Sequence, residues 1–254
     1  MSDTDDRRAR LALSCLDLTN LNDDCTPADI EDLCGRAITS HGHVAAVCIW
    51  PEFVKQASEL LSEKPVRIAT VVNFPAGGED VDAVVAETET AVTDSANEID
   101  LVMPYRRIAD DPDSVYGLVA ATRRAAGKAL LKVILETGEL KDDGLIRKAS
   151  DIAVEAGADF LKTSTGKVPV NATPEAARIM LAVIADHGGD IGFKPAGGIR
   201  TLDDANVYLD LAAEALGADW ATPRTFRFGA SSLLDNLLAV LEGRSGGESG
   251  GGGY

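Results

Sequence analysis

The chain has 254 residues, of which 45% are hydrophobic and 26% are charged, a composition typical of a soluble globular protein with one large core. Acidic residues outnumber basic residues by 41 to 24, which gives a net charge of −17. A negative field of this size repels phosphate backbones and anionic lipids, so we expect neither nucleic acid nor a membrane as a partner. The first residues, MSDTDDRRAR, lack the apolar stretch of a secretion signal, so we expect a cytoplasmic location.

Cysteines and histidines give little support for a metal site. The four cysteines, at positions 15, 25, 34 and 48, form no CxxC pair, and only three histidines occur, at 41, 43 and 187. Zinc and iron sites usually need several such residues at short spacings. We therefore expect no metal and no cofactor, and we expect reduced thiols rather than disulfides.

Short apolar runs alternate with longer amphipathic stretches along the chain. The runs predict eight strands, at 11–17, 44–50, 66–72, 98–103, 129–136, 158–164, 191–196 and 225–230. The stretches between them have helical periodicity. One of them begins with Thr173 as N-cap and Pro174 in its first turn, and ends at Gly188 and Gly189.

Eight such units in 254 residues, about 32 residues each, favour an α/β fold, namely a single-domain (β/α)8 TIM barrel. A doubly wound open sheet is the alternative, but no strand is followed by GxGxxG. We assign residues 1–242 to the barrel, with 1–10 as an N-terminal extension. The Gly-rich residues 243–254 are expected to form a flexible tail that ends in Tyr254.

Charged residues interrupt four consecutive predicted strands. Asp100, Lys132, Lys162 and Lys194 are separated by 32, 30 and 32 residues, about one strand–helix unit each. Because one side-chain face of every barrel strand points into the interior, we expect these groups to converge near the axis. Buried charges are costly unless they are paired, so a purely structural ion network is one interpretation.

The alternative interpretation is a nucleophilic amine. Burial and a neighbouring cation both favour an uncharged lysine, and a neutral amine can attack a carbonyl carbon to form a Schiff base. Lys162 is the predicted nucleophile because a small-residue loop follows it at the C-terminal strand end, where barrels carry their chemistry. Lys194 would supply the neighbouring cation, and Asp100 would relay protons.

Glycine-bearing loops follow the last three predicted strands. Glycine lets backbone N–H groups approach an anion, and a helix N-terminus favours negative charge, so these loops predict a phosphate site. The candidate residues are Thr165, Gly166 and Lys167 in the first loop, Gly197, Gly198 and Arg200 in the second, and Gly229, Ser231 and Ser232 in the third.

The segments LDLTNLNDD, EIDLVMPY, LLKVILETGEL, ADFLKTSTGK, GFKPAGGIR and FRFGASSLL together resemble the bacterial 2-deoxyribose-5-phosphate aldolase family from about residue 11 to the C-terminus. The resemblance implies a metal-independent class I lyase that cleaves a phosphosugar to an aldehyde and D-glyceraldehyde 3-phosphate, acting as a monomer or homodimer. It assigns the Schiff base to Lys162, the second lysine to Lys194 and proton relay to Asp100. It also implies substrate-binding or orienting roles for Asp17, Thr19, Cys48 and Lys132, and a proton-transfer role for Tyr254.

Two other functions fit part of the pattern. A transaldolase-like barrel would also use a lysine on a phosphosugar. A non-catalytic phosphosugar-binding protein would bind the same ligand without a covalent adduct, although simple binding does not require paired strand lysines.

Overall fold

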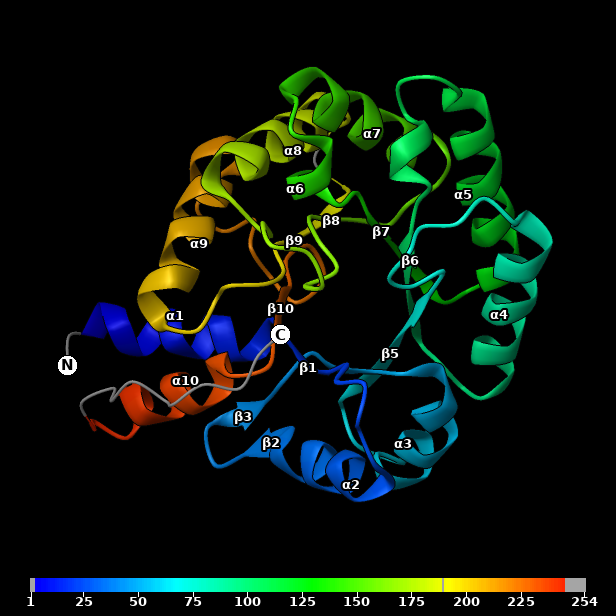
Figure 1. Cartoon of the computed structure of the whole chain (residues 1–254). Helices are drawn as coiled ribbons and strands as arrows, with labels where there is room; N and C mark the ends of the chain where they lie inside the picture. Colours follow the sequence, from blue (N-terminus) through cyan, green and yellow to red (C-terminus); the bar gives the residue numbers. More distant parts are fainter. Residues whose placement is uncertain (1–2, 189, 245–254) are drawn as a thin grey trace.

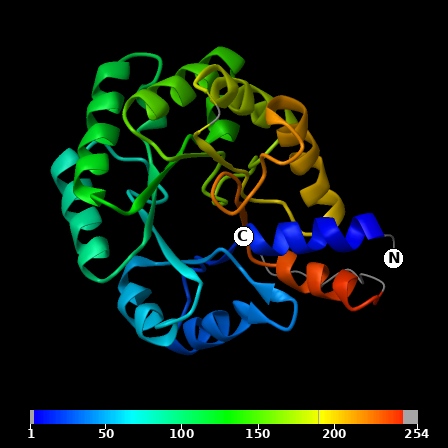
Figure 2. The same cartoon turned by 180° about the vertical axis from the view of Figure 1, so that it is seen from behind.

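In the computed structural model, which describes residues 3–188 and 190–244, eight parallel strands form a ring surrounded by helices (Figures 1 and 2). The strands are β1 (Leu16–Asn20), β4 (Ala46–Ile49), β5 (Arg67–Val72), β6 (Glu98–Val102), β7 (Leu130–Ile134), β8 (Phe160–Lys162), β9 (Gly192–Lys194) and β10 (Phe228–Ala230). They pair in the order β10-β1-β4-β5-β6-β7-β8-β9. Parallel bridges Phe193–Phe226 and Ala196–Gly229 join the two ends. The predicted (β/α)8 barrel is therefore confirmed.

The outer layer consists of α1 (Asp3–Ser14), α2 (Pro27–Arg36), α3 (Val54–Leu60), α4 (Val81–Thr93), α5 (Pro112–Ala126), α6 (Thr137–Leu140), α7 (Asp143–Glu155), α8 (Pro174–Asp186), α9 (Leu202–Leu216) and α10 (Leu233–Leu241). The 3-10 turns η1 (Pro51–Phe53) and η2 (Tyr105–Arg107) and a small antiparallel pair, β2 (Ile38–Thr39) with β3 (Gly42–His43), complete the chain. The expected start of α8 is confirmed, since the Thr173 side chain accepts a hydrogen bond from the Ala176 N–H.

The predicted first strand at 11–17 is wrong in its start, because residues 11–14 belong to α1. Acidic side chains in the first turn suit a helix N-terminus, and Asp6 pairs with Arg10 one turn later at 2.7 Å. Ala9, Ala12 and Leu13 are buried and lie on one helix face. The apolar run LAL therefore completes the buried face of a helix, and the strand begins only at Leu16.

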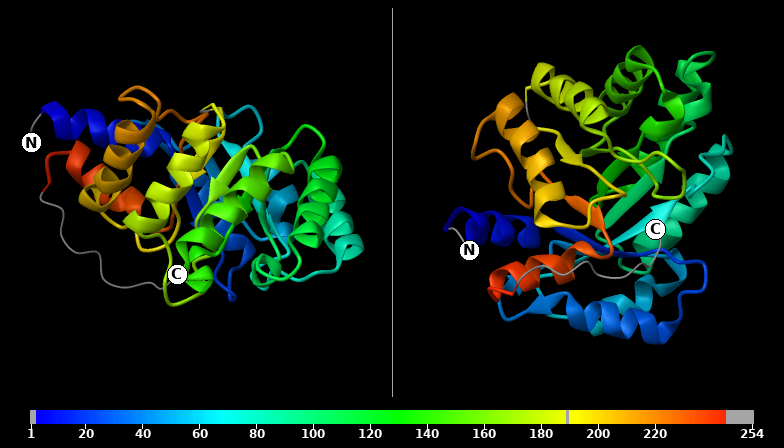
Figure 3. Two further views of the ribbon diagram at one scale, coloured as in Figure 1. Left: turned by 90° about the horizontal axis from the view of Figure 1, so that it is seen from above. Right: turned by 60° about the vertical axis from the view of Figure 1, so that its left-hand side comes forward.

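The two ends of the described chain lie close together. Helices α1 and α10 run side by side at one edge of the barrel (Figures 1 and 3). Residues 245–254, including Tyr254 and most of the predicted tail, lie outside the described residues. No helix in the described part of the chain is both long and apolar enough to cross a membrane.

Candidate active site

Four neighbouring strands bring the predicted charged residues together inside the barrel. Asp100 on β6 lies opposite Lys132 on β7, and Lys162 on β8 lies opposite Lys194 on β9. Lys162 is also opposite Ile134, so the second pair lies two residues further along the strands than the first. All four side chains are at most 2% exposed. The expected convergence is confirmed, and the four residues occupy two adjacent layers rather than one.

Asp100 is the centre of this cluster. Its Oδ1 accepts a hydrogen bond from Lys132 Nζ at 2.7 Å, and its Oδ2 accepts hydrogen bonds from Lys162 Nζ and Lys194 Nζ, each at 2.8 Å. Burial alone would raise the pKa of the carboxyl group, but the three ammonium groups outweigh burial and hold the pKa well below its usual value. Asp100 is therefore ionised and fully occupied by lysines.

A second set of charged residues contacts the lysines of this cluster. Asp17 accepts a hydrogen bond from Lys194 Nζ at 2.5 Å, and Glu98 forms an ion pair with Lys132 Nζ at 2.7 Å. The buried Arg227 guanidinium contacts Asp17 at 2.7 Å and Glu98 at 2.8 Å. Burial would lower the pKa of Lys194, yet Asp100 and Asp17 raise it well above its usual value. Lys194 is thus held as a cation beside Lys162.

Sequence reasoning missed Glu98 and Arg227 in this network. Both had the signal that identified the lysines, since each is a charged residue inside an apolar strand-like run, EIDLV and FRFG. Glu98 also lies two residues before Asp100, which places the two side chains on the same face of β6.

The charges joined by these ion pairs do not balance, and Glu136, another buried carboxylate that Lys162 influences, lies outside the ion pairs. Four cations, Lys132, Lys162, Lys194 and Arg227, face three carboxylates, Asp17, Glu98 and Asp100, which leaves one positive charge in excess. Arginine does not deprotonate in proteins. Among the described residues, Lys132 and Lys194 each contact at least two carboxylates, whereas Lys162 contacts only Asp100. Lys162 is the lysine whose conversion to a free amine costs the fewest ion pairs.

Cys48 and Thr19 lie on neighbouring strands beside the cluster. They are opposite each other on β4 and β1. Cys48 Sγ donates to Asp100 Oδ2 at 3.9 Å, and Thr19 Oγ1 donates to the Asp17 carbonyl oxygen at 2.8 Å. Burial raises the pKa of the Cys48 thiol. The thiol therefore lies close to the lysines in its neutral, weakly nucleophilic form.

The loop after β8 is held by Glu136, which sequence reasoning also missed. The buried Glu136 accepts hydrogen bonds from Thr165 Oγ1 at 2.5 Å and from the Thr165 N–H at 3.1 Å. Its backbone has a φ of +55°, an uncommon conformation for a residue other than glycine. Ser164 Oγ beside this contact is buried without a hydrogen-bond partner among the described residues, so the strand end presents a polar atom that a ligand can satisfy.

The predicted phosphate residues divide into two places. Eight residues from the loop after β9, the end of β10 and the turn that follows it line one small pocket, namely Gly197, Gly198, Ile199, Arg200, Gly229, Ala230, Ser231 and Ser232. Lys167 lies elsewhere: its ammonium group contacts Asp23 at 2.9 Å and the Trp50 ring at 5.8 Å. Thr165 is buried against Glu136. The structure therefore brings Arg200 to the glycine loops and does not bring Lys167 there.

This glycine pocket begins directly at the lysine cluster. A Cβ atom on Gly229 would lie 2.8 Å from Ala196 Cβ and 3.1 Å from Lys194 Cε. On the other side, Gly197 has a φ of +83°, and a Cβ there would lie 2.7 Å from Asn171. Only glycine permits this close approach of β9 and β10. The glycine pocket therefore lies next to the Lys194 side chain.

The donor set around the site is poor in metal ligands. Within residues 3–188 and 190–244, no three His, Cys, Asp or Glu side chains are grouped as they would be around a metal ion. The carboxylates of the cluster are already paired with lysines and an arginine. The expectation of a metal-independent reaction remains a prediction.

Comparisons with known proteins agree on one family. The family model described as DeoC/LacD family aldolase matches residues 11–239. Deoxyribose-phosphate aldolase of Agrobacterium fabrum is 60% identical over 238 residues, which cover 92% of each chain. A structure described as "QR15, an Aldolase" has a TM-score of 0.78 at 30% identity, with 91% of this chain and 96% of that chain covered. The tetrameric deoxyribose phosphate aldolase of Aeropyrum pernix has a TM-score of 0.74 at 26% identity, with 94% and 98% covered.

Proposed function

Because this chain belongs to the DeoC/LacD family of aldolases, we propose that it is a deoxyribose-phosphate aldolase, which reversibly cleaves 2-deoxy-D-ribose 5-phosphate to acetaldehyde and D-glyceraldehyde 3-phosphate. The observation that carries the proposal is the buried pair Lys162 and Lys194, which donate to one oxygen of Asp100. The relative from Agrobacterium fabrum, 60% identical, has the same activity in its name.

Lys162 is the nucleophile of this reaction. Its free amine attacks C1 of the open-chain sugar, and loss of water leaves an iminium ion. The ion pairs support this role, because Lys162 contacts a single carboxylate among the described residues and its conversion to a free amine breaks the fewest ion pairs. The iminium then accepts the electrons of the C2–C3 bond and becomes an enamine, so the protein never has to stabilise a free carbanion.

Asp100 and Lys194 move protons around the iminium. Their hydrogen bonds to the same oxygen provide a short path between the two amines that avoids bulk water. The low pKa of Asp100 makes its carboxylate a weak base on its own, so it acts together with Lys194 or a water molecule when the C3 hydroxyl loses its proton. Hydrolysis of the protonated enamine releases acetaldehyde and restores Lys162. Tyr254 is proposed to assist protonation of the enamine.

The phosphate binds in the glycine pocket at the ends of β9 and β10. Backbone N–H groups of the loops that contain Gly197, Gly198 and Gly229, the residues Ser231 and Ser232 at the start of α10, and the Arg200 side chain surround it. Asp17, Thr19, Cys48 and Lys132 support the lysines and orient the sugar. Thr165, Gly166 and Lys167 are proposed to contact the substrate from the loop after β8. The proposal includes a cytoplasmic location and a monomeric or homodimeric state, which sedimentation analysis distinguishes from a tetramer.

The direct test is an assay for acetaldehyde released from 2-deoxy-D-ribose 5-phosphate. We expect release by the native chain, near-complete loss in Lys162→Ala, and full activity in the control Lys55→Ala, whose side chain is exposed. A transaldolase-like enzyme would release no acetaldehyde. A binding protein would bind the sugar phosphate and leave it intact, and either result would refute the proposal.

A further inference from the structure

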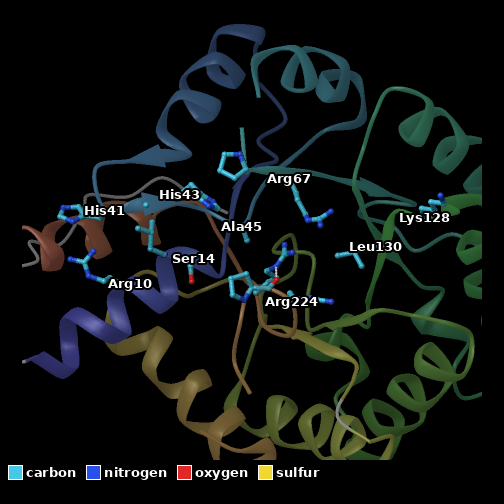
Figure 4. A pocket seen from close by; sticks show the side chains of 14 residues that line it. Arg10, Ser14, His41, His43, Ala45, Arg67, Lys128, Leu130 and Arg224 are labelled. Carbon is cyan, nitrogen blue, oxygen red and sulfur yellow. Dashed lines mark hydrogen bonds between the residues drawn. The ribbon is translucent and has the colours of Figure 1, made fainter. Parts of the chain in front are cut away.

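A cavity of about 700 Å³ opens at the end of the barrel opposite the glycine loops. It is lined by α1 and by residues at or just before the N-terminal ends of β4, β5, β7 and β10. Figure 4 shows the lining side chains around one opening, with His41 and His43 on one side and Lys128 on the other. Barrel enzymes place their chemistry at the C-terminal strand ends, so this cavity is separate from the aldolase site.

The cavity is strongly basic in an acidic protein. Its described lining contains five basic residues, Arg10, Arg67, Lys128, Arg224 and Arg227, and no carboxylate, although the chain has 41 acidic residues and 24 basic ones. This local excess of cations is the reverse of the net charge of −17. An anion that is repelled elsewhere on the surface is attracted here.

Three of the five cations are available to a ligand. Arg10 is paired with Asp6, and Arg227 with Asp17 and Glu98. Arg67 lies 3.7 Å from Glu98, but that carboxylate already pairs with Lys132 and Arg227.

Lys128 and Arg224 pair with no carboxylate in the described part of the chain. Together with Arg67, they enter the cavity from three different strand ends. Cations spaced in this way suit an anion with more than one phosphoryl group.

We propose that this cavity binds a small molecule that carries a di- or triphosphate group. Its volume is within the range of small-molecule sites, and Leu13, Leu130, Pro65 and Pro223 give it an apolar wall for the rest of such a ligand. A nucleic acid does not fit this description, because its backbone would extend past the basic lining onto a surface of negative net charge.

The cavity is also linked to the aldolase site, an extension that depends on the proposed function. Arg67 and Arg227 contact Glu98, Glu98 contacts Lys132, and Lys132 contacts Asp100. A bound anion that attracts Arg67 weakens the contact of Arg67 with Glu98. Glu98 then pairs more strongly with Lys132, which weakens the contact of Lys132 with Asp100, shifts the carboxylate that Lys162 and Lys194 share, and slows the reaction without blocking the substrate.

Calorimetric titration with inorganic pyrophosphate at low ionic strength tests the site. We expect saturable binding that weakens about tenfold or more in Arg224→Ala and again in Lys128→Ala/Arg224→Ala, since each substitution removes a charge-assisted hydrogen bond. The control Arg200→Ala, in the glycine pocket, should leave this binding unchanged. No saturable binding, or binding lost in Arg200→Ala and retained in the double variant, would refute the proposed site.

This binding experiment is independent of catalysis, so it stands even if the chain has no aldolase activity. For the link, we expect pyrophosphate to lower the rate at saturating sugar phosphate, which is kcat, in the native chain, with no such effect in the double variant. Pyrophosphate bound at the basic cavity without any change in kcat would refute the link between the two sites.

Discussion

At the scale of single residues, one carboxylate organises the site. Asp100 accepts hydrogen bonds from three lysines of three consecutive strands, and two of these bonds end on one oxygen. Such an arrangement keeps Lys194 charged and leaves Lys162 with the fewest carboxylate contacts among the described lysines of the cluster. The geometry therefore distinguishes two lysines that look alike in the sequence.

Replacing Asp100 by Asn tests this arrangement. We expect kcat to fall about 10²- to 10⁴-fold, the usual contribution of a positioned proton-transfer group, while an imine still forms on Lys162. Steady-state kinetics and mass spectrometry of the borohydride-reduced protein measure the two effects separately.

The matched control is Glu98→Gln, which removes a buried carboxylate of the same network that contacts Lys132 but not, among its described contacts, Lys162. Glu98→Gln should lower the free energy of unfolding, and it should lower kcat less than Asp100→Asn does. Equal losses of kcat in the two variants would mean that Asp100 only holds the network together.

At the scale of elements, the contact of β9 with β10 sets the position of Lys194. Gly229 is the residue that allows the contact, because a Cβ there would lie 2.8 Å from Ala196 Cβ and 3.1 Å from Lys194 Cε. We expect Gly229→Ala to cost about 1–3 kcal/mol of unfolding free energy, and to lower kcat by up to about 10²-fold through displacement of the lysine. Urea unfolding and kinetics measure these two effects.

Gly117 in α5 provides the control, because a Cβ at that position would meet no atom within 4 Å. Gly117→Ala should be neutral or stabilising, since alanine favours a helix. If Gly229→Ala behaved like Gly117→Ala, the close approach of β9 and β10 would not matter for the position of Lys194.

The N-cap of α8 allows a test of how much helix capping contributes to stability. The Thr173 side chain accepts the Ala176 N–H at 3.2 Å, so Thr173→Ala should lower the unfolding free energy by about 1 kcal/mol. Thr90→Ala is the control, because Thr90 lies inside α4 and donates only to its own helix at Ala86. A change of equal size in both variants would contradict a specific cap, and urea titration of the two proteins decides between them.

Sequence patterns predicted the elements well where propensity and burial agreed. The predicted start of the first strand was wrong because the run LAL suits a buried helix face as well as a strand, and only packing against the barrel decides between the two. The convergence of Asp100 with the lysines followed from spacing alone. The position of Lys167 outside the lining of the glycine pocket did not follow from the sequence, since no local rule tells that its side chain turns toward Asp23 and Trp50 instead of Arg200. Glu136 was missed because its role depends on a backbone with φ of +55°.

At the scale of the whole molecule, the buried ion pairs among the lysines, Arg227 and the three carboxylates form a network that connects most strands of the barrel. Its members come from β1, β6, β7, β8 and β9 and from the segment before β10. Burial is costly for each charge, so the network stabilises the fold only while the carboxylates stay ionised. Both the stability of the fold and the proposed reaction therefore depend on the protonation state of these buried groups.

This dependence predicts a loss of stability in acid. The pKa values of Asp17, Glu98 and Asp100 are lowered in the folded state, because the lysines and Arg227 outweigh the effect of burial. The unfolded carboxyls bind protons near their ordinary values of about 4. Between these values and the lower folded pKa values the unfolded chain holds more protons, so the unfolding free energy falls as the pH drops below about 4.

Urea unfolding at a series of pH values from 7 to 3 measures this slope. In Asp100→Asn, the free energy of unfolding should fall less between pH 7 and pH 3 than in the native chain, because the variant lacks one of the three titrating groups. An equal drop in both proteins would show that the acid sensitivity arises outside the cluster.

The most direct test of the account is to trap the reaction intermediate. The native chain is incubated with acetaldehyde, reduced with borohydride, digested and mapped by mass spectrometry. We expect Lys162 to be the ethyl-modified lysine inside the barrel, with this modification lost in Lys162→Ala and present in Lys55→Ala. Modification at Lys132 or Lys194, or no modification inside the barrel, would contradict it.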